Sequence, residues 1–447
     1  MNEKVIVLHP VLLQRKADAE GEIRKFVRDP GAALQEAAGL ARAIDLAVVH
    51  EEIIRLKEIT PATLIGSGVA ERTKKLAEEL KVGLVFVDYA LSPVQQRNLE
   101  KALHCKVIDR TGLILEIFGA RARTKEGMLQ VDLAALNFQR SRLVKSWTHL
   151  ERQRGGGGFM GGPGETQIEL DRRLIDDRIK KLKTELEDVK KNRRLQRESR
   201  KREPYPIIAI VGYTNAGKST LFNKITGADV FAKDLLFATL DTTMRGIELP
   251  SGKKAILSDT VGFISDLPTH LVAAFRATLE EVQEASVILH VRDIAQPDTD
   301  AEKEDVLAIL RDLGIDTDRD ERIVEVLNKI DALPDRERKA LLTKAKRQKN
   351  VVPVSALSGA GIDTLLETVD AYLGRDRKTL WVDIGVADGK ALSWLYSHGE
   401  VMDRQDEEAF VRVKVSIEPA DAERFTDKFP YKFTKTKPKA KKARAAS

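Results

Sequence analysis

The segment at residues 212–219, which carries glycines at its first and sixth positions, constrains the fold of the chain more than any other feature. The segment follows the pattern G-x-x-x-x-G-K-S, directly after an apolar run at residues 207–211 and before a predicted helix. Backbone N–H groups in such a loop point at phosphate groups, at the positive end of the helix. Lys218 is then expected to contact the β- and γ-phosphates of a nucleotide, and Ser219 to give an oxygen to Mg²⁺. The predicted phosphate-binding loop consists of Gly212, Tyr213, Thr214, Asn215, Ala216, Gly217, Lys218, Ser219 and Thr220.

A D-x-x-G motif follows the apolar strand predicted at residues 255–257. It places the Asp259 carboxylate to hold the Mg²⁺ shell and the Gly262 N–H to meet the γ-phosphate, with Thr260 and Val261 between them. Such a segment changes conformation when the γ-phosphate is lost, so the motif predicts a switch. The tetrapeptide alone is also compatible with a strand-end turn, but its order and spacing after the phosphate loop favour the nucleotide site.

A base-recognition motif, N-K-x-D, follows the apolar strand predicted at residues 323–327, where open α/β sheets bind ligands. It consists of Asn328, Lys329, Ile330 and Asp331. The Asp331 carboxylate can accept two hydrogen bonds from guanine, whose N1–H and N2–H₂ donors adenine does not present together. At the end of the next strand, the backbone of Ser355, Ala356 and Leu357 is expected to donate an N–H to guanine O6. The motifs in this order predict an enzyme that hydrolyses GTP.

The rest of the chain is long enough for several domains, because 447 residues exceed the about 250–300 residues at which one core stops growing. Alternating apolar strands and amphipathic helices predict an α/β fold class, with a doubly wound, phosphate-loop GTPase domain. We expect an N-terminal α/β domain at 1–129, a long helical hairpin with a glycine-rich tip at 130–203, the GTPase domain at 204–374, a small C-terminal α+β domain at 375–430 and a basic, disordered tail at 431–447.

The hairpin is predicted from apolar residues at helical spacing. These residues are Leu133, Leu136, Leu143, Trp147 and Leu150 in the first helix, and Ile175, Ile179, Leu182, Leu186 and Val189 in the second. Residues 171–203 and the tail are also rich in Lys and Arg, which favours an RNA partner over a merely solvated surface. We expect the tip, flanked by Arg154, to reach RNA.

Composition favours a cytoplasmic protein. Cys105 is the only cysteine, which excludes an intramolecular disulfide and a multi-cysteine zinc site and fits a reducing compartment. The N-terminus has no basic region followed by a long apolar stretch, and no apolar run reaches about 18 residues. Neither export nor a membrane span is expected.

The segment between the first two motifs supplies a resemblance to a known family. It contains Phe237, Ala238, Thr239, Leu240 and Asp241, in a region where a GTPase needs a threonine to complete the Mg²⁺ shell, and three threonines compete for that role. The segment resembles the HflX family of GTPases, in which this switch element reads F-A-T-L-D. By that resemblance Thr239 is a metal ligand, together with Ser219 and Asp259. It is also a catalytic residue, together with Lys218 and Gly262.

Three further segments resemble HflX motifs: residues 91–100 (LSPVQQRNLE), 121–124 (RART) and 162–167 (GPGETQ). The resemblance implies a GTPase that associates with the large ribosomal subunit and ribosomal RNA and separates stalled or idle ribosomes into subunits. The alternative is an RNA-binding or ribosome-assembly module in which GTP acts mainly as a conformational switch. We expect a monomer that cycles between GTP and GDP.

The chain departs from related patterns at three places. Thr242 stands where the HflX family usually has proline, and Phe263 stands where Ras-type enzymes have a glutamine that orients water, so intrinsic hydrolysis should be slow. In the N-terminal domain, Gly66-Ser67-Gly68 lacks the lysine that members often carry next, so we expect a tight turn and no second nucleotide site.

Asn215 is open to two interpretations. Some GTPases that share G-x-x-N-x-G-K-S with this chain use the asparagine to help hold K⁺ beside the phosphates. Alternatively, asparagine is present because it tolerates the left-handed backbone of the loop.

Overall fold

The computed structural model describes residues 3–13, 28–153, 163–200, 205–227, 236–237, 243–265, 281–375, 377–417 and 419–438. The chain divides into two compact units, Met1–Leu366 and Glu367–Ser447, and the division falls within one helix of the GTPase domain. In the described part of the chain, no helix combines the length and the apolar character that crossing a bilayer requires.

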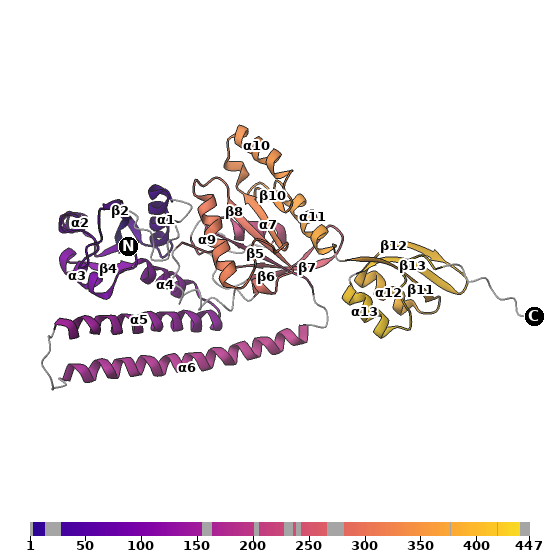
Figure 1. Cartoon of the computed structure of the whole chain (residues 1–447), viewed down its shortest axis with the longest axis horizontal. Coiled ribbons are helices and arrows are strands. Elements are labelled where there is room, and N and C mark those ends of the chain that lie inside the picture. The colour runs from indigo at the N-terminus through magenta and orange to yellow at the C-terminus, as the bar shows by residue number, and fades with distance from the viewer. Residues whose placement is uncertain are drawn as a thin grey trace, which may run out of the picture. The chain divides into compact units, whose positions relative to one another are not determined.

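The N-terminal part of the first unit is a four-stranded parallel sheet in the order β2-β1-β3-β4. Alternate residues of β1 face opposite sides: Val5 and Val7 pack with α1 and α4, whereas Ile6 and Leu8 pack with α2 and α3. Helices therefore cover both faces of this sheet (Figure 1). The elements are β1 (Lys4–Leu12), α1 (Pro30–Arg42), β2 (Ala47–Leu56), α2 (Ser67–Leu80), β3 (Leu84–Val87), α3 (Pro93–Leu103), β4 (Lys106–Asp109) and α4 (Arg110–Arg121).

The predicted tight turn at Gly66-Ser67-Gly68 is wrong. Gly66 caps the N-terminus of α2 with an extended backbone (φ −68°, ψ 158°), and Ser67 and Gly68 are already helical. The helix forms because the residues that follow include good helix formers, and it buries Ala70, Thr73 and Ala77 on one side. Neither Gly66 nor Gly68 has a positive φ, so no backbone strain requires these glycines.

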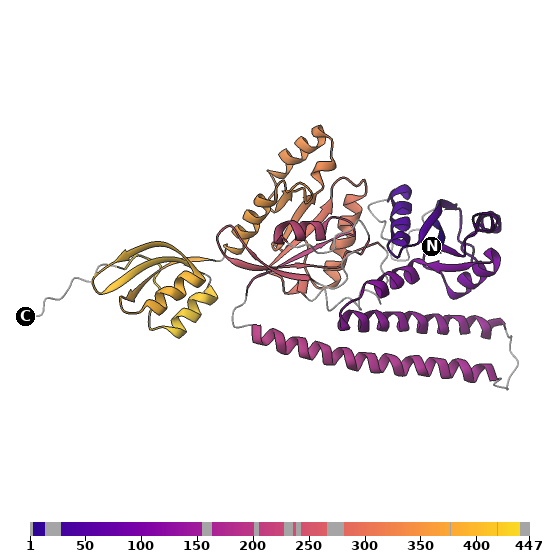
Figure 2. The same ribbon diagram turned by 180° about the vertical axis from the view of Figure 1, so that it is seen from behind.

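The predicted helical hairpin consists of α5 (Lys125–Gln153) and α6 (Pro163–Arg200). The two helices lie side by side in both views (Figures 1 and 2) and share an apolar seam. Leu129, Leu182 and Leu186 are buried in that seam, and Arg140 forms an ion pair with Asp176 at 3.0 Å. The predicted tip at residues 155–162 lies outside the described residues.

The GTPase domain is built on a six-stranded sheet in the order β10-β9-β8-β5-β7-β6. All neighbours are parallel except β6, which pairs antiparallel with β7 at the edge. Every residue of the central strand β8 is buried. The elements are β5 (Ile207–Gly212), α7 (Lys218–Thr226), β6 (Thr243–Glu248), β7 (Lys254–Asp259), β8 (Val287–Asp293), α9 (Thr299–Asp312), β9 (Ile323–Asn328), η1 (Ile330–Ala332), α10 (Asp335–Ala345), β10 (Val351–Pro353) and α11 (Ile362–Leu373).

The C-terminal unit contains an antiparallel three-stranded sheet in the order β11-β13-β12. Its inward residues pack with those of two helices around Phe425, which is completely buried. The elements are β11 (Lys378–Gly385), α12 (Gly389–His398), β12 (Gly399–Asp406), β13 (Phe410–Ile417) and α13 (Pro419–Lys428). The predicted fold class is confirmed; the predicted domain boundaries stay predictions, and residues 439–447 of the tail lie outside the described residues.

Candidate functional site

The loop between β5 and α7 has the conformation that phosphate binding requires. A Cβ atom on Gly212 would lie 2.2 Å from the carbonyl oxygen of Val291, and one on Gly217 would lie 2.2 Å from Asn328 Nδ2. Gly217 has a φ of 90° and Asn215 a φ of 60°, both in the left-handed region. Only glycine fits at positions 212 and 217. At position 215, asparagine is one of the few other residues that tolerate a left-handed backbone.

Lys218, the first residue of α7, is buried at the centre of the site. Its Nζ donates a hydrogen bond to the carbonyl oxygen of Tyr213 at 2.6 Å, which holds the side chain along the loop. Burial lowers the pKa of Lys218 to about 8, although the nearby Asp259 carboxylate acts in the opposite direction. The ammonium group is therefore still mostly charged at pH 7, as contact with phosphate requires.

Ser219 and Asp259 come together although 40 positions separate them in the sequence. Ser219 Oγ donates to Asp259 Oδ2 at 2.8 Å, and Asp259 is completely buried at the end of β7. Hard oxygen donors such as this hydroxyl, near the start of α7, and this carboxylate, at the end of β7, are the ligand type that Mg²⁺ prefers. Of the first switch, Ala238, Thr239, Leu240 and Asp241 lie outside the described residues. Phe237 is buried and packs edge-to-face against Phe118 of α4, at 4.7 Å between ring centroids.

The D-x-x-G segment is held directly against the phosphate loop. Thr260 Oγ1 donates to the Ile210 carbonyl oxygen at 2.7 Å, and the Val261 side chain is buried in the core. A Cβ atom on Gly262 would lie 2.9 Å from Thr214 Cγ2 and 3.0 Å from Lys218 Nζ. The backbone of Gly262 is thus the part of this motif that lies next to Lys218, and a larger residue would displace it.

Asn328 connects the base-recognition loops to the phosphate loop. Its Nδ2 donates to the Ala216 carbonyl oxygen at 2.8 Å, and its Oδ1 accepts from the Ala356 N–H at 3.0 Å. The side chain therefore orders the two loops, which is a more specific role than the nucleotide contact predicted from the motif. Asp331, predicted to bind guanine, lies on the short helix η1 and is exposed.

Lys329 and Ser355 are fixed by polar contacts of their own. Lys329 has a left-handed backbone (φ 63°), and its Nζ forms an ion pair with Asp293 Oδ2 at 2.8 Å. Ser355 is completely buried and its Oγ accepts from the Ser358 N–H at 3.1 Å, whereas the Leu357 side chain is 77% exposed. Sequence reasoning missed Asp293, although its place at the carboxyl end of the fully buried strand β8 was a usable signal.

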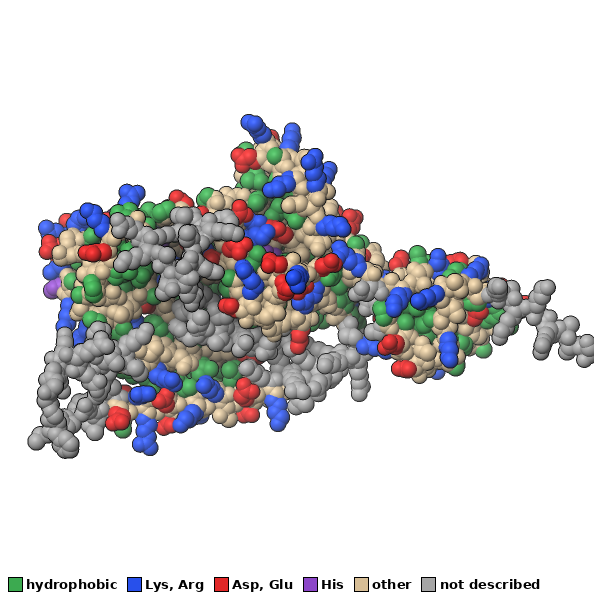
Figure 3. Space-filling model, viewed as in Figure 1, with side chains coloured by type: hydrophobic (Ala, Val, Ile, Leu, Met, Phe, Trp, Pro, Cys, Tyr) green, Lys and Arg blue, Asp and Glu red, His purple; other side chains and the backbone are tan. Residues whose placement is uncertain are grey.

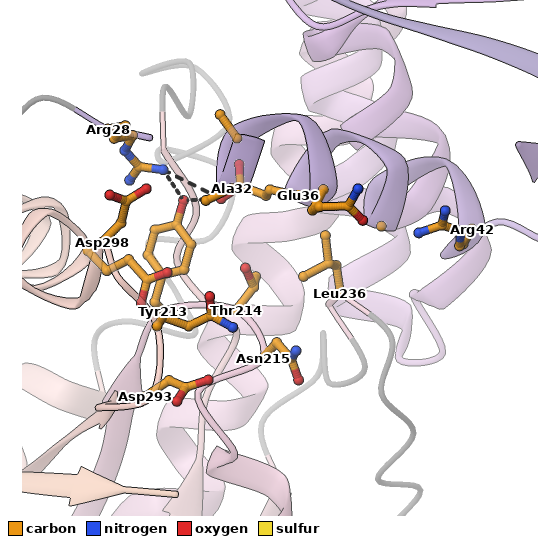
Figure 4. Close-up of a pocket in the computed structure, with 15 residues that line it drawn as sticks. Arg28, Ala32, Glu36, Arg42, Tyr213, Thr214, Asn215, Leu236, Asp293 and Asp298 are labelled. Atoms are coloured by element: carbon orange, nitrogen blue, oxygen red, sulfur yellow. Dashed lines mark hydrogen bonds and ion pairs between the residues drawn. The ribbon is translucent and has the colours of Figure 1, made fainter. Parts of the chain in front are cut away.

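A cavity of about 420 Å³ opens between the phosphate loop and α1. Figure 4 shows its walls, with Tyr213, Thr214 and Asn215 on one side and Glu36 and Arg42 of α1 on the other. The charged residues of the lining are four acidic ones and two arginines: Glu36, Asp293, Asp298, Glu302, Arg28 and Arg42. Burial, followed by the charge of Glu36, raises the pKa of Glu302 to about 7. Sequence reasoning did not find this cavity, because α1 and the loop are far apart in the chain and share no motif.

Sequence comparison decides the family. Over 387 residues the chain is 48% identical to the GTPase HflX of Magnetococcus marinus, covering 87% of this chain and 88% of that protein. The chain belongs to the HflX family of GTPases. It is also 45% identical to the GTPase HflX of Escherichia coli over 336 residues, covering 75% of this chain and 78% of the relative. As an HflX-family member with a complete GTPase domain, the chain is a GTP hydrolase.

Family models cover most of this HflX-family chain in four consecutive blocks. Residues 31–119 match the GTP-binding GTPase N-terminal model, 121–200 the GTP-binding GTPase middle region, 207–329 the 50S ribosome-binding GTPase and 340–438 the HflX C-terminal domain. Among solved structures, a GTP-binding protein from Sulfolobus solfataricus in complex with GDP is 23% identical, with a TM-score of 0.43, over 83% of this chain and 98% of that one.

Proposed function

We propose that this HflX-family GTPase acts in the cytoplasm as a Mg²⁺-dependent monomer that binds the large ribosomal subunit and separates stalled or idle ribosomes into subunits. The match of residues 207–329 to the 50S ribosome-binding GTPase model carries the proposal. Membership of the family establishes the GTPase activity, and the proposed ribosomal partner is the assembly on which that activity acts.

The proposed chemistry uses groups that the fold has already brought together. Lys218 binds the β- and γ-phosphates, the Gly262 N–H binds the γ-phosphate, and Asp331 selects guanine. The burial of Lys218 and the close packing of Gly262 against it support this assignment, because a charge and a backbone donor beside the γ-phosphate would stabilise the negative charge that develops during phosphoryl transfer. Preorganised donors of this kind lower the barrier without reorganisation during the reaction.

The donor set fits Mg²⁺. We propose Ser219, Asp259 and Thr239 as its ligands; the first two are in hydrogen-bond contact through oxygen atoms at 2.8 Å. In the described part of the chain, no group of three or more His, Cys, Asp and Glu side chains is arranged to hold a metal by itself. The ion would then depend on phosphate oxygens of GTP as well, which is usual for Mg²⁺, and when bound it neutralises phosphate charge.

A basic surface around α10 suits a ribosomal RNA partner. Lys and Arg side chains gather over α10 and the turn after it at the top of Figure 3, whereas along α6 exposed Lys and Arg side chains alternate with acidic ones. Around α10 the exposed basic residues outnumber the acidic ones, and they surround a shallow pocket lined by Lys339, Lys344 and Arg347. Such surfaces attract phosphate backbones without reading sequence.

Co-sedimentation with separated ribosomal subunits tests the partner. We expect the full chain to pellet with the large subunit in the presence of a non-hydrolysable GTP analogue, and much less with GDP. Light scattering of intact ribosomes then measures splitting. Binding to the small subunit alone, or to neither subunit in either nucleotide, would contradict the proposal.

The basic surface on α10 can be tested separately from the nucleotide site. Lys344→Glu combined with Arg347→Glu should weaken large-subunit binding about tenfold or more and make it less salt-dependent, because two phosphate contacts are lost. The matched control is Lys75→Glu combined with Lys101→Glu, two exposed lysines on α2 and α3. Equal effects of the two double variants would show that total charge, and not this surface, governs binding.

A second candidate function is an RNA-binding or assembly module in which GTP is mainly a conformational ligand. Phe263 favours it, because a phenylalanine in the place of a water-orienting glutamine neither donates nor accepts a hydrogen bond. Splitting that needs hydrolysis would exclude this candidate. Splitting that persists with the non-hydrolysable analogue would show that binding alone moves the subunits apart.

We also propose K⁺ as an activating ion beside Asn215. The four carboxyl groups that line the neighbouring cavity support a cation there, although two arginines line it as well. The left-handed backbone of Asn215 explains the residue without a cation. Substituting Na⁺ for K⁺ distinguishes the two explanations.

A further inference from the structure

A buried polar cluster joins the phosphate loop to the N-terminal sheet. It consists of Glu36 on α1, Arg110 at the start of α4, Tyr213 in the phosphate loop and Ser265 after the D-x-x-G motif, and we call it the Tyr213 cluster. Arg28 adjoins it and donates to the Tyr213 hydroxyl at 3.0 Å. The Ser265 N–H donates to the Tyr213 hydroxyl at 2.8 Å, and that hydroxyl donates to Glu36 Oε2 at 2.5 Å. Figure 4 shows the Tyr213 hydroxyl directed at α1.

Arg110 closes the cluster from the other side. Its Nη2 donates to Glu36 Oε1 at 2.6 Å, to Ser265 Oγ at 2.9 Å and to the Ser265 carbonyl oxygen at 3.1 Å. Its Nη1 donates to Asp88 Oδ1 at 2.5 Å, and Asp88 in turn contacts His9 Nδ1 at 2.8 Å. Although burial opposes it, the charges of Asp88 and Glu36 hold the pKa of Arg110 well above its ordinary value, so the guanidinium is permanently charged.

Ser265 is thereby fixed, and so is the short segment before it. The Phe263 N–H donates to the Gly212 carbonyl oxygen at 3.1 Å, and the Thr214 N–H donates to the Phe263 carbonyl oxygen at 2.7 Å. Residues 262–265 are therefore bound to the phosphate loop at one end and to the Tyr213 cluster at the other. Within this segment Gly262 lies against Lys218, and both residues are proposed to contact the γ-phosphate.

We propose that Tyr213 is a positioning residue for the GTP-bound state, because its hydroxyl ties Ser265 to Glu36 and so holds the Gly262 N–H next to Lys218. GTP needs that N–H for its γ-phosphate, whereas GDP has no γ-phosphate to receive it. The Tyr213 hydroxyl thus contributes to GTP affinity and not to GDP affinity. The inference rests on the proposed contact between Gly262 and the γ-phosphate.

The competing explanation is that Tyr213 is a packing residue. Its ring is buried in the core, and its pKa is raised well above the ordinary value by burial first and by Glu36 second, so the phenol stays neutral. A packing role would lower the stability of the protein when the hydroxyl is removed but would leave the ratio of GTP to GDP affinity unchanged. That ratio is the decisive quantity.

The test is Tyr213→Phe in the full chain, titrated with fluorescent GDP and with a fluorescent non-hydrolysable GTP analogue. Removing a hydroxyl that serves a buried N–H and a carboxylate should weaken binding of the GTP analogue about tenfold, with GDP affinity changed by less than about twofold. Glu36→Gln should act in the same direction with a smaller effect, and it replaces Tyr213→Phe as the test if that variant does not fold.

Tyr431→Phe is the matched control. Its hydroxyl also donates to a carboxylate, Asp388 Oδ2 at 3.1 Å, but it belongs to the C-terminal unit. Neither nucleotide affinity should change. An unchanged ratio of GTP to GDP affinity in Tyr213→Phe would overturn the inference.

Gly262→Ala separates failure of the inference from failure of the site assignment. If this variant keeps its preference for GTP over GDP, Gly262 does not contact the γ-phosphate, and the premise is wrong. If Gly262→Ala loses the preference while Tyr213→Phe and Glu36→Gln keep it, the contact exists but the Tyr213 cluster does not position it.

Discussion

The first unit contains two sheets, one parallel and one parallel except for the edge strand β6, whose carboxyl ends differ in their side chains. In the GTPase domain these ends carry a glycine loop, an exposed Asp331 and loops ordered by Asn328, so backbone donors remain available for a ligand. In the N-terminal sheet His9, within β1, contacts Asp88, which directly follows β3, and the Arg110 side chain donates to the same Asp88 carboxylate from the start of α4. This is the switch point of the sheet, where α/β proteins commonly bind ligands.

The difference shows that architecture alone does not make a nucleotide site. At the N-terminal switch point, charged side chains of the protein pair with one another, and Arg110 also donates hydrogen bonds to Ser265 of the GTPase domain. The GTPase domain keeps its switch point open with glycines at positions where a side chain would collide.

Arg110→Leu should have the largest effect, because it removes the buried guanidinium that pairs with both Asp88 and Glu36, which would then depend on His9 and Arg28 as ion-pair partners. Breaking a buried pair from one side costs about 3–5 kcal/mol of stability. Urea denaturation of the full chain measures it. Arg311→Leu, which breaks an exposed pair with Glu304 at 3.1 Å, should cost less than about 1 kcal/mol. Equal losses would mean that the N-terminal cluster is not structural.

Ser219→Ala should lower GTP hydrolysis about a hundredfold or more while leaving the fold intact, because it removes a proposed oxygen ligand of Mg²⁺ that also donates a hydrogen bond to Asp259. Phosphate release at saturating Mg²⁺ measures turnover, and circular dichroism checks the fold. Thr226→Ala, on the same helix but with its hydroxyl bonded to the Phe222 carbonyl, is the control. Normal turnover in Ser219→Ala would remove the metal assignment.

GTP affinity should fall as the pH rises above about 8, by up to about tenfold per pH unit, because the free Lys218 ammonium then loses its proton. The sign of the stability effect is opposite. Since the folded pKa lies below the ordinary 10.5, the cost of burying the charge disappears between about pH 8 and 10.5, and the apo protein gains stability there. Fluorescence titration of Lys218→Ala should give a flat profile over the same range.

The smallest effect concerns Asn215. If K⁺ binds beside it, GTP turnover should be several-fold faster in K⁺ than in Na⁺ at equal ionic strength, because an added cation stabilises developing phosphate charge. Asn215→Ala should remove that difference with GTP affinity nearly unchanged. Equal rates in both salts, with and without ribosomes, would leave Asn215 as a left-handed backbone residue.

The GTPase site was largely predictable from the sequence, because each of its motifs is local and follows an apolar strand. Gly212, Lys218 and Asp259 lie where their motifs place them, at the ends of β5 and β7 and the start of α7. Strand β6 was not predicted, since its half-exposed edge position produces no continuous apolar run. Strand β2 was not predicted for the same reason, because His50, Glu51 and Glu52 interrupt its apolar run.

The Tyr213 cluster could not be predicted from the sequence. Its contacts join residues that are 177 and 155 positions apart, and only Tyr213 belongs to a spaced motif, at a position whose residue the motif does not specify. Arg110 and Glu36 are charged residues of amphipathic helices, a pattern typical of solvent-exposed positions. Only the packing of α1 and α4 against the GTPase domain shows that Arg110 is buried and Glu36 partly buried.

Nucleotide binding to the full chain tests most directly whether the GTPase switch point alone binds nucleotide and selects guanine. Isothermal titration should give one site per chain for GTP in the presence of Mg²⁺ and no binding of ATP. Asp331→Asn should weaken GTP about tenfold or more and improve xanthosine triphosphate, whose C2 oxygen would meet the new amide donor. ATP binding to the unmodified chain, a second site for GTP, or unchanged GTP affinity in Asp331→Asn would contradict the account.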